Sequence, residues 1–234
     1  MDWVYLRSEL QRIVVYVILG LAAKGGYHLL PGQSVVVMPS PPPVVMPVVP
    51  PPAPPAMPLP RVDPEGSVVR IPGCTATVIG PSPKPGYQFV LSAAHCTRPR
   101  QLLKVTHLRS GRVYDGFVYR HDSSRDLALI VLKTPDLLDY AAVALTPPAE
   151  GTRVWHRGHG VDRPGNREDG VVIRSGADGS FCRLQISVSS GDSGSGFFRS
   201  DTGELVATCY GTDGRWTVGP GVIAIRRFLQ DAAG

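Results

Sequence analysis

Proline occupies about every second position between Pro39 and Pro60, and this stretch decides where a folded domain can begin. Proline has no backbone N–H and a fixed φ, so neither a helix nor a central strand can form there. We expect a semi-rigid spacer that could span roughly 70 Å at about 3.1 Å per residue in polyproline II geometry. A ligand for proline-binding modules is the alternative, but no recognition pattern with a well-placed basic residue is present. The 234-residue chain therefore divides into residues 1–30, a linker at 31–66 and a domain at 67–234.

The segment before the linker has the features of an export signal. Arg7 and Arg12 precede the apolar run 13–23, and Lys24 ends it. Eleven apolar residues are short for a bilayer span, which needs about 20, and suit the core of a secretory signal. Three interpretations of this segment are possible: a cleaved signal, an uncleaved membrane anchor, or an amphipathic helix packed on the domain. The spacer that follows slightly favours the anchor, because a spacer is most useful when its start is held in place. The prediction is an extracytoplasmic protein, secreted or held at a membrane through residues 1–30.

The remainder of the chain favours an all-β fold. It is rich in glycine (26) and proline (24) but has only 7% aromatic residues, which indicates many turns and short strands. Only Ile225 to Ala233 has helical spacing of its apolar residues. Many short strands and one terminal helix describe a pair of β-barrels or a sandwich. Strands are predicted at 68–71, 75–79, 88–91, 113–118, 127–132, 152–155, 171–174, 181–186, 204–210 and 221–224.

The formal net charge of +5 does not indicate a nucleic-acid-binding protein. The arginines are scattered along the chain, and no basic run is interleaved with aromatic residues that could stack on bases. We therefore expect no nucleic-acid partner.

Gly191-Asp192-Ser193-Gly194 places one hydroxyl between residues small enough to let a substrate approach the backbone. Ser193 is the candidate nucleophile. A serine hydroxyl is nearly inert at neutral pH, so this interpretation needs a histidine base and a carboxylate that orients the histidine.

Both partners are found upstream of the serine. His95 ends an apolar run, and Asp126 begins another, Leu127 to Leu132. Asp122 is the rival carboxylate, but no long apolar strand follows it directly. The alternative roles are a core histidine beside Cys96 and an aspartate paired with Arg125. The order His95, Asp126, Ser193 predicts a catalytic triad.

These three stretches resemble those of the chymotrypsin and trypsin-like serine peptidases, in the chain order of that family. The resemblance covers roughly Val68 to Asp231. It implies two antiparallel six-stranded β-barrels, at about 67–140 and 141–234, with the site in the cleft between them. It also implies that His95 is the general base, that Asp126 orients it, and that the amides of Gly191 and Ser193 form the oxyanion hole.

The resemblance also bears on the four cysteines. Cys74 and Cys96 match the disulfide that closes the loop carrying the catalytic histidine. Cys182 and Cys209 match the bridges of the family less well, and they form either a second bridge or a pair of buried thiols. We expect no cofactor and no metal, because the cysteines are isolated and the histidines of His156-Arg157-Gly158-His159 have no nearby cysteine partners. That stretch is predicted to be a turn.

The sequence departs from the family in two places. No Ile-Val-Gly-Gly precedes Cys74 at the distance of the activated N-terminus of trypsin-like members, so Asp192 has another partner or no such activation is needed. Ser195 and Gly196 stand where glycine and proline commonly follow Ser-Gly. Both departures resemble compact bacterial members of the family.

By resemblance, the primary specificity pocket has Ser187 at its base. Its walls are Val188 to Ser190, the segment Cys209, Tyr210 and Gly211, and Gly221. Trypsin-like members carry an acid at the position of Ser187, and a lysine or arginine side chain needs that partner because an unpaired buried cation costs several kcal/mol. Asp213 is the nearby candidate acid, but its position predicts a place at the solvent rim. Cleavage after apolar or aromatic residues is therefore predicted, with the extended substrate paired to residues 209–211.

Two functions follow from these observations. The first is a serine endopeptidase that acts on proteins or peptides. The alternative is a catalytically silent relative that uses the cleft or the proline-rich arm as a membrane-tethered protein-binding module. The intact set His95, Asp126 and Ser193 favours the enzyme.

Overall fold

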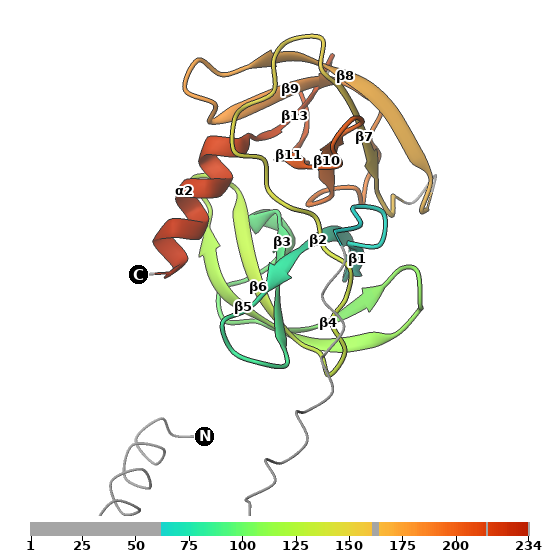
Figure 1. Cartoon of the computed structure of the whole chain (residues 1–234), viewed down its shortest axis with the longest axis vertical. Helices are drawn as coiled ribbons and strands as arrows, with labels where there is room; N and C mark the ends of the chain where they lie inside the picture. Colours follow the sequence, from blue (N-terminus) through green and yellow to red (C-terminus); the bar gives the residue numbers. More distant parts are fainter. Residues whose placement is uncertain (1–61, 161–163, 214, 234) are drawn as a thin grey trace, which may run out of the picture. The chain divides into compact units, whose positions relative to one another are not determined.

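The computed structural model describes residues 62–160, 164–213 and 215–233, and Figure 1 shows their arrangement. The export-like segment 1–30 and the proline-rich stretch lie outside the described residues. Within the described ranges, none of the helices has the length and apolar character needed to cross a membrane.

The first half of the domain is a closed barrel of six antiparallel strands in the order β1-β2-β3-β6-β5-β4, as predicted. Alternating small and β-branched residues on these strands point inward and form a buried core that includes Val78, Val90, Val105 and Ile130. The strands are β1 (Val68–Ile71), β2 (Cys74–Pro81), β3 (Tyr87–Ser92), β4 (Leu102–His107), β5 (Val113–Asp122) and β6 (Leu127–Lys133).

The second half, where the second barrel was predicted, is a curled sheet of seven strands in the order β11-β10-β7-β8-β9-β13-β12. The additional strand, β12, is a two-residue edge strand paired with β13. The sheet curls because an isolated bridge from Ala207 to Gly221 joins β11 to the chain just after β13. The strands are β7 (Arg153–Arg157), β8 (Arg167–Ser175), β9 (Phe181–Gln185), β10 (Gly196–Arg199), β11 (Leu205–Thr208), β12 (Gly211–Thr212) and β13 (Thr217–Pro220).

One predicted strand is wrong. Residues 222–224, predicted as the end of a strand, begin the terminal helix α2 (Val222–Ala233). Val222, Ile225 and Phe228 are fully buried three residues apart, so the buried helical face begins three residues earlier than predicted. Strands β4, β10, β12 and β13 were not predicted. In β4, the buried residues Leu103 and Val105 alternate with exposed or polar residues, and two apolar positions are too few to predict a strand from the sequence.

The two halves share a hydrophobic core, which fixes their relative position at the site. Leu91 and Leu129 of the first barrel pack in one buried cluster with Trp155 and Phe198 of the second sheet and with Phe228 of α2. Figure 1 shows α2 lying against both halves. Contacts of this kind hold residues from distant parts of the chain in a constant geometry.

The described part of the linker contacts the first barrel. Val62 forms a parallel bridge with Tyr140, and Asp63 forms an ion pair with Arg109 at 2.8 Å. Asp63 also accepts the backbone N–H groups of Glu65 and Gly66. The contacts of the domain therefore include residues before the predicted start at Ser67.

Candidate active site

His95 lies in a short 3₁₀ helix, η1 (Ala94–Cys96), that follows β3. Ala93 and Ala94 are buried at its start, and a disulfide joins Cys74 to Cys96 at its end. The predicted bridge is thus confirmed. It attaches the histidine loop to the first residue of β2, while the imidazole itself remains exposed.

Asp126 lies just before β6 with a backbone φ of +53°, a left-handed conformation that is uncommon for a residue with a side chain. Asp122 holds the preceding turn, because its Oδ1 accepts the backbone N–H groups of Ser124 and Arg125 and the Ser124 hydroxyl. Burial acts to raise the pKa of Asp122, but these hydrogen bonds outweigh it and lower the pKa. The rival carboxylate therefore shapes the turn that presents Asp126.

The carboxylate of Asp126 binds His95 at three points. Nδ1 of the imidazole lies 2.9 Å from Oδ2 and 3.0 Å from Oδ1, and the backbone N–H of His95 donates to Oδ1 at 2.9 Å. A carboxylate accepts only, so Nδ1 carries the proton and Nε2 is left as the basic nitrogen. The edge of the Tyr210 ring meets the imidazole at a centroid distance of 5.6 Å. Both the tautomer and the plane of the ring are therefore constrained.

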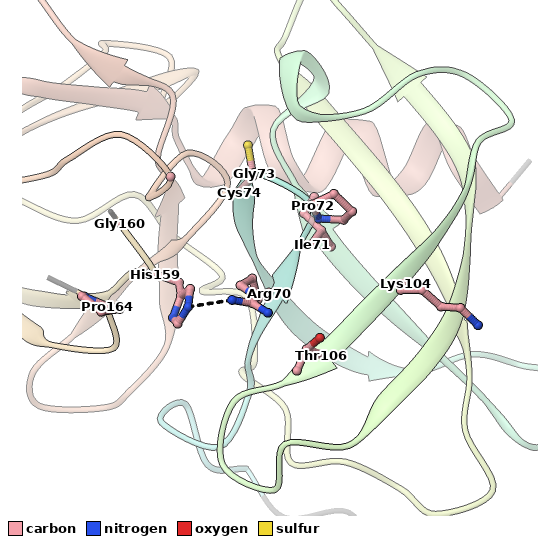
Figure 2. A pocket seen from close by; sticks show the side chains of 11 residues that line it. Arg70, Ile71, Pro72, Gly73, Cys74, Lys104, Thr106, His159, Gly160 and Pro164 are labelled. Carbon is pink, nitrogen blue, oxygen red and sulfur yellow. Dashed lines mark hydrogen bonds between the residues drawn. The ribbon is translucent and has the colours of Figure 1, made fainter. Parts of the chain in front are cut away.

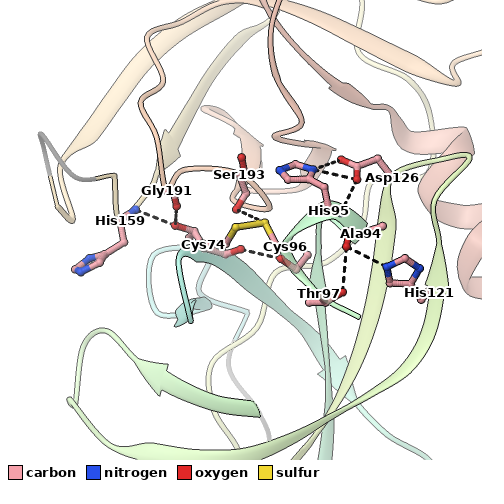
Figure 3. The surroundings of a disulfide bond; sticks show 12 residues. Cys74, Ala94, His95, Cys96, Thr97, His121, Asp126, His159, Gly191 and Ser193 are labelled. Carbon is pink, nitrogen blue, oxygen red and sulfur yellow. Dashed lines mark hydrogen bonds and ion pairs between the residues drawn. A yellow bond between two sulfur atoms is a disulfide. The ribbon is translucent and has the colours of Figure 1, made fainter. Parts of the chain in front are cut away.

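Ser193 follows the sharp turn of the Gly-Asp-Ser-Gly motif. Its carbonyl oxygen accepts the N–H of Thr75 at 3.0 Å, which ties the turn to β2. Gly194 has a φ of +83°, and a Cβ at this position would overlap Ser92 and the Thr75 carbonyl. Figure 3 shows the ring of His95 between Ser193 and Asp126. The structure does not connect the Ser193 hydroxyl to His95 by a hydrogen bond.

The backbone before Ser193 forms a loop that is supported by the side chain of Thr75. The Thr75 hydroxyl donates to the carbonyl of Gly191 at 2.8 Å and accepts the N–H of His159 at 2.9 Å. Within the described ranges, no protein acceptor takes the amide hydrogens of Gly191 or Ser193. Two neighbouring backbone donors that are free of protein partners can bind an oxyanion.

Asp192 binds partners within the domain in place of the activated N-terminus that it pairs with in trypsin-like members of the family. Its side chain is buried, with Oδ1 accepting the N–H of Gly160 at 2.7 Å and Oδ2 accepting that of Ser189 at 2.7 Å. The Ser189 hydroxyl adds a longer contact at 3.3 Å. A Cβ on Gly158 or Gly160 would overlap the Asp192 carboxylate or Ser189, so both glycines permit this close approach.

The predicted base of the specificity pocket is held by a buried histidine. Nε2 of His156 donates to the carbonyl of Ser187 at 2.9 Å, and the Thr217 hydroxyl donates to the neighbouring carbonyl of Ile186 at 2.6 Å. The prediction that His156 lies in a turn is wrong, because it is a buried residue of β7. Inward-facing positions of a strand can hold a histidine when both its nitrogens are engaged.

Tyr210, Gly211 and Gly221 of the predicted wall come from two segments of the second half. The backbone N–H of Tyr210 donates to Val218 on β13 at 3.0 Å, and the edge strand β12 begins at Gly211. Gly221 follows β13 directly; its N–H donates to Ser180, and a Cβ on it would approach Gly179 and Phe181. A bridge to Ala207 places Gly221 beside β11, the strand that precedes Cys209.

Cys182 and Cys209 are both free and buried, so the second bridge considered from the sequence is not formed. Cys182 pairs with Gly219 on β13, and the chain at Cys209 lies on the other side of the same strand. Two strand spacings separate their backbones by roughly 10 Å, beyond the reach of a disulfide. Burial raises the pKa of Cys182 to about 11 and that of Cys209 to about 12, so both thiols stay protonated at neutral pH.

The sequence reasoning placed Ser189 only in the pocket wall, and it missed Thr75 and the glycines at 158 and 160. The only local signal was the spacing of two glycines around His159, in the place where the family often has an aromatic residue. Thr75 gave no signal beyond its position directly after Cys74. The roles of Thr75 and Gly160 depend on hydrogen bonds between residues 116 and 32 positions apart.

The comparisons with known proteins agree with this fold. The inactive form of the Rv3671c protease of M. tuberculosis H37Rv matches with a TM-score of 0.59 at 19% identity over 73% of this chain and 90% of that chain. A serine endoprotease from Yersinia pestis matches with a TM-score of 0.58 at 17% identity over 72% of this chain and 63% of that chain. At these identities the likeness concerns the fold. No curated protein sequence gives a match. The model of the trypsin-like peptidase domain matches residues 74–207, and the chain therefore belongs to this family of serine peptidases.

Proposed function

We propose that this protein is a serine endopeptidase that cleaves proteins or peptides through an acyl-enzyme on Ser193. The observation that carries the proposal is the three-point attachment of His95 to Asp126, which leaves Nε2 as the basic nitrogen on the side of Ser193. A base of this kind is what a serine hydroxyl needs to become a nucleophile at neutral pH.

In the proposed reaction, Nε2 of His95 takes the hydroxyl proton as Ser193 Oγ attacks the scissile carbonyl carbon. The same nitrogen then delivers the proton to the leaving amine, and the acyl group stays on Oγ. Water then attacks the acyl carbon while Nε2 takes its proton, and that proton passes to Oγ as the acid product leaves. Asp126 stabilises the imidazolium between these transfers. The hydrogen bond between Ser193 and His95 forms in the substrate complex, as catalytic hydrogen bonds often tighten only there.

The developing oxyanion would be bound by the amides of Gly191 and Ser193. Their orientation is supported by the Thr75 hydroxyl on the Gly191 carbonyl and by the buried carboxylate of Asp192. An oxyanion donor is typically worth about 3 to 4 kcal/mol in the transition state. Because Asp192 is satisfied within the domain by Gly160 and Ser189, the loop needs no new N-terminus to hold it in place.

For the specificity, we propose cleavage after apolar or aromatic residues. Asp213 supports this, because its Oδ1 accepts the backbone N–H groups of Arg215 and Trp216 and its Oδ2 pairs with Arg183 at 3.3 Å. These hydrogen bonds, that of Trp216 first, lower the pKa of Asp213. A carboxylate occupied in this way at the rim is a poor partner for a lysine or arginine inside the pocket.

We also propose that the domain works outside the cytoplasm. The disulfide between Cys74 and Cys96 supports this location, since such bonds persist mainly in oxidising compartments. Residues 1–30 would direct the export or hold the protein at a membrane.

The test is labelling of the full chain with a fluorophosphonate probe, followed by mass spectrometry of the modified peptide. Modification at Ser193 is expected, and both His95→Ala and Ser193→Ala should abolish it. His107→Gln is the matched control, since His107 bonds Ser110 and Gly66 and none of these bonds reaches the loop of His95, so labelling should stay intact. Labelling that survives the loss of His95 would contradict the proposed triad. Absence of labelling in the unmodified chain would favour the catalytically silent binding module.

A further inference from the structure

A pocket of about 550 Å³ opens beside the candidate site, on the side away from Asp126. It lies between the first barrel and the 158–160 segment, and Arg70, Cys74, His159 and Gly191 are among the residues that line it (Figure 2). Gly191 thus belongs both to this pocket and to the proposed oxyanion loop. A substrate held at Ser193 would therefore extend directly into the pocket.

The position of the pocket assigns it to the leaving-group side of the cleft. The acyl side of a substrate would lie against the predicted specificity residues Ser187 and Cys209 to Gly211, and none of these lines the pocket. Figure 3 shows Gly191 and His159 on one side of Ser193 and His95 with Asp126 on the other. At about 3.3 Å per extended residue, the first two or three residues after the scissile bond can reach it.

The charge in the pocket comes from Arg70. Its Nη1 donates to Nε2 of His159 at 3.1 Å, and burial together with the nearby Arg70 charge lowers the pKa of His159, which is therefore neutral. Across the described ranges, no carboxylate forms an ion pair with Arg70. Lys104 also lines the pocket, but it pairs with Asp115. Arg70 therefore presents a positive charge and free N–H donors to the pocket.

We propose that this pocket binds an acidic side chain of the substrate, within the first three residues after the cleaved bond. The neutral imidazole of His159 holds the guanidinium by one N–H and leaves the others for a carboxylate, whose two oxygens match the guanidinium fork. The proposal rests on the proposed peptidase function, and it adds a preference on the side of the substrate where the resemblance made no prediction.

The test uses internally quenched peptides that share one acyl half and end in an amide, so that a side chain supplies the only carboxylate on the leaving side. The second residue after the cleaved bond is Glu, Gln or Lys, and a second series varies the neighbouring positions. The full chain should show a kcat/KM about five- to tenfold higher for Glu than for Gln, with Lys lowest. The preference should shrink at high salt because the site is open to solvent.

Arg70→Ala should remove the difference between Glu and Gln, and Arg70→Lys should retain only part of it because lysine lacks the planar fork. Arg112→Ala is the matched control, an exposed arginine of the same barrel that pairs with Asp136 and does not line the pocket. Equal cleavage of the Glu and Gln peptides by the full chain, or the same preference in Arg70→Ala, would overturn the proposal.

Binding separates this proposal from the peptidase function. The amidated tripeptides Ala-Glu-Ala and Ala-Gln-Ala, which imitate leaving groups, are titrated into the Ser193→Ala chain by calorimetry. The Ser193→Ala chain should bind the Glu peptide more tightly than the Gln peptide, and the double variant Ser193→Ala/Arg70→Ala should bind both equally. This result supports the acid pocket even if the probe fails to label Ser193. Equal binding of the two peptides argues against the pocket, whatever the labelling shows.

Discussion

The hydroxyl of Thr75 donates a hydrogen bond to the carbonyl oxygen of Gly191 at 2.8 Å, across 116 positions of the sequence. Thr75 is a fully buried residue of β2, and Gly191 belongs to the loop that precedes the candidate nucleophile. The first barrel therefore supports the backbone of the proposed oxyanion loop directly. Thr75 touches no substrate in this arrangement and acts as a positioning residue.

Thr75→Val should lower the rate of fluorophosphonate labelling by about tenfold, because the lost hydrogen bonds are worth about 1 to 2 kcal/mol and leave the Gly191 carbonyl unpaired. In peptide cleavage, the substitution should lower kcat more than it raises KM, since the loop binds the oxyanion of the transition state. Thr75→Ser, which keeps the hydroxyl, should restore most of the rate.

Thr152→Val is the matched control for this prediction, because Thr152 lies directly before β7 and lines a separate surface pocket with Arg199 and Asp201. Its labelling rate should equal that of the unmodified chain. A Thr75→Val protein with full labelling would show that the loop holds its conformation without this support.

Cleavage specificity should follow the absence of an acid at Ser187. A library of peptides varied at the residue before the cleaved bond should favour Leu and Phe over Lys and Arg by more than about tenfold, since an unpaired cation in the pocket is unfavourable. Ser187→Asp should move the preference toward Lys and Arg. Asp213→Asn should leave it unchanged, and a profile dominated by Lys and Arg that Asp213→Asn abolishes would identify Asp213 as the acid.

Cysteine alkylation should separate the four cysteines into two classes. In the native chain at about pH 8, iodoacetamide should modify neither Cys182 nor Cys209, because both thiols are buried and burial raises their pKa to about 11 and about 12. Unfolding without a reductant should expose these two thiols, and reduction should then expose Cys74 and Cys96. Four modified cysteines before reduction would be inconsistent with the disulfide, and none would indicate a second bridge.

The turn before Asp126 should contribute stability that depends on pH. The pKa of Asp122 is lower in the folded protein than its ordinary value of 3.8, so its contribution is present above that pH and is lost as the pH falls through the folded pKa. Asp122→Ala should therefore reduce the free energy of unfolding by about 1 to 2 kcal/mol near pH 7, measured by urea denaturation. The difference from the unmodified chain should shrink below about pH 4.

A matched comparison for this prediction is Asp136→Ala, which removes an exposed ion pair with Arg112 and should cost little at any pH. A loss of stability for Asp122→Ala that is the same at pH 3 and pH 7 would assign the effect to packing instead of the charged carboxylate.

The sequence alone determined the class of fold and the candidate chemistry. Short β-branched runs between turn residues form strands in almost any all-β context, so β1, β3, β5 and β6 lie where they were predicted. The family motifs around His95, Asp126 and Ser193 identified the candidate triad, because each motif is a continuous stretch that can be recognised without knowing its neighbours. The bridge between Cys74 and Cys96 followed from the same resemblance.

Only the tertiary structure decided which residues support that chemistry. The hydrogen bonds of Thr75 to Gly191, of Gly160 to Asp192, and of His156 to Ser187 join segments that have no fixed spacing in sequence. The order of the strands placed β13 between Cys182 and the chain at Cys209, so these two cysteines stay free. A strand fixes only the alternation of its own side chains. The partner that faces each residue depends on strand order and on the packing of the two halves, which are properties of the whole folded domain.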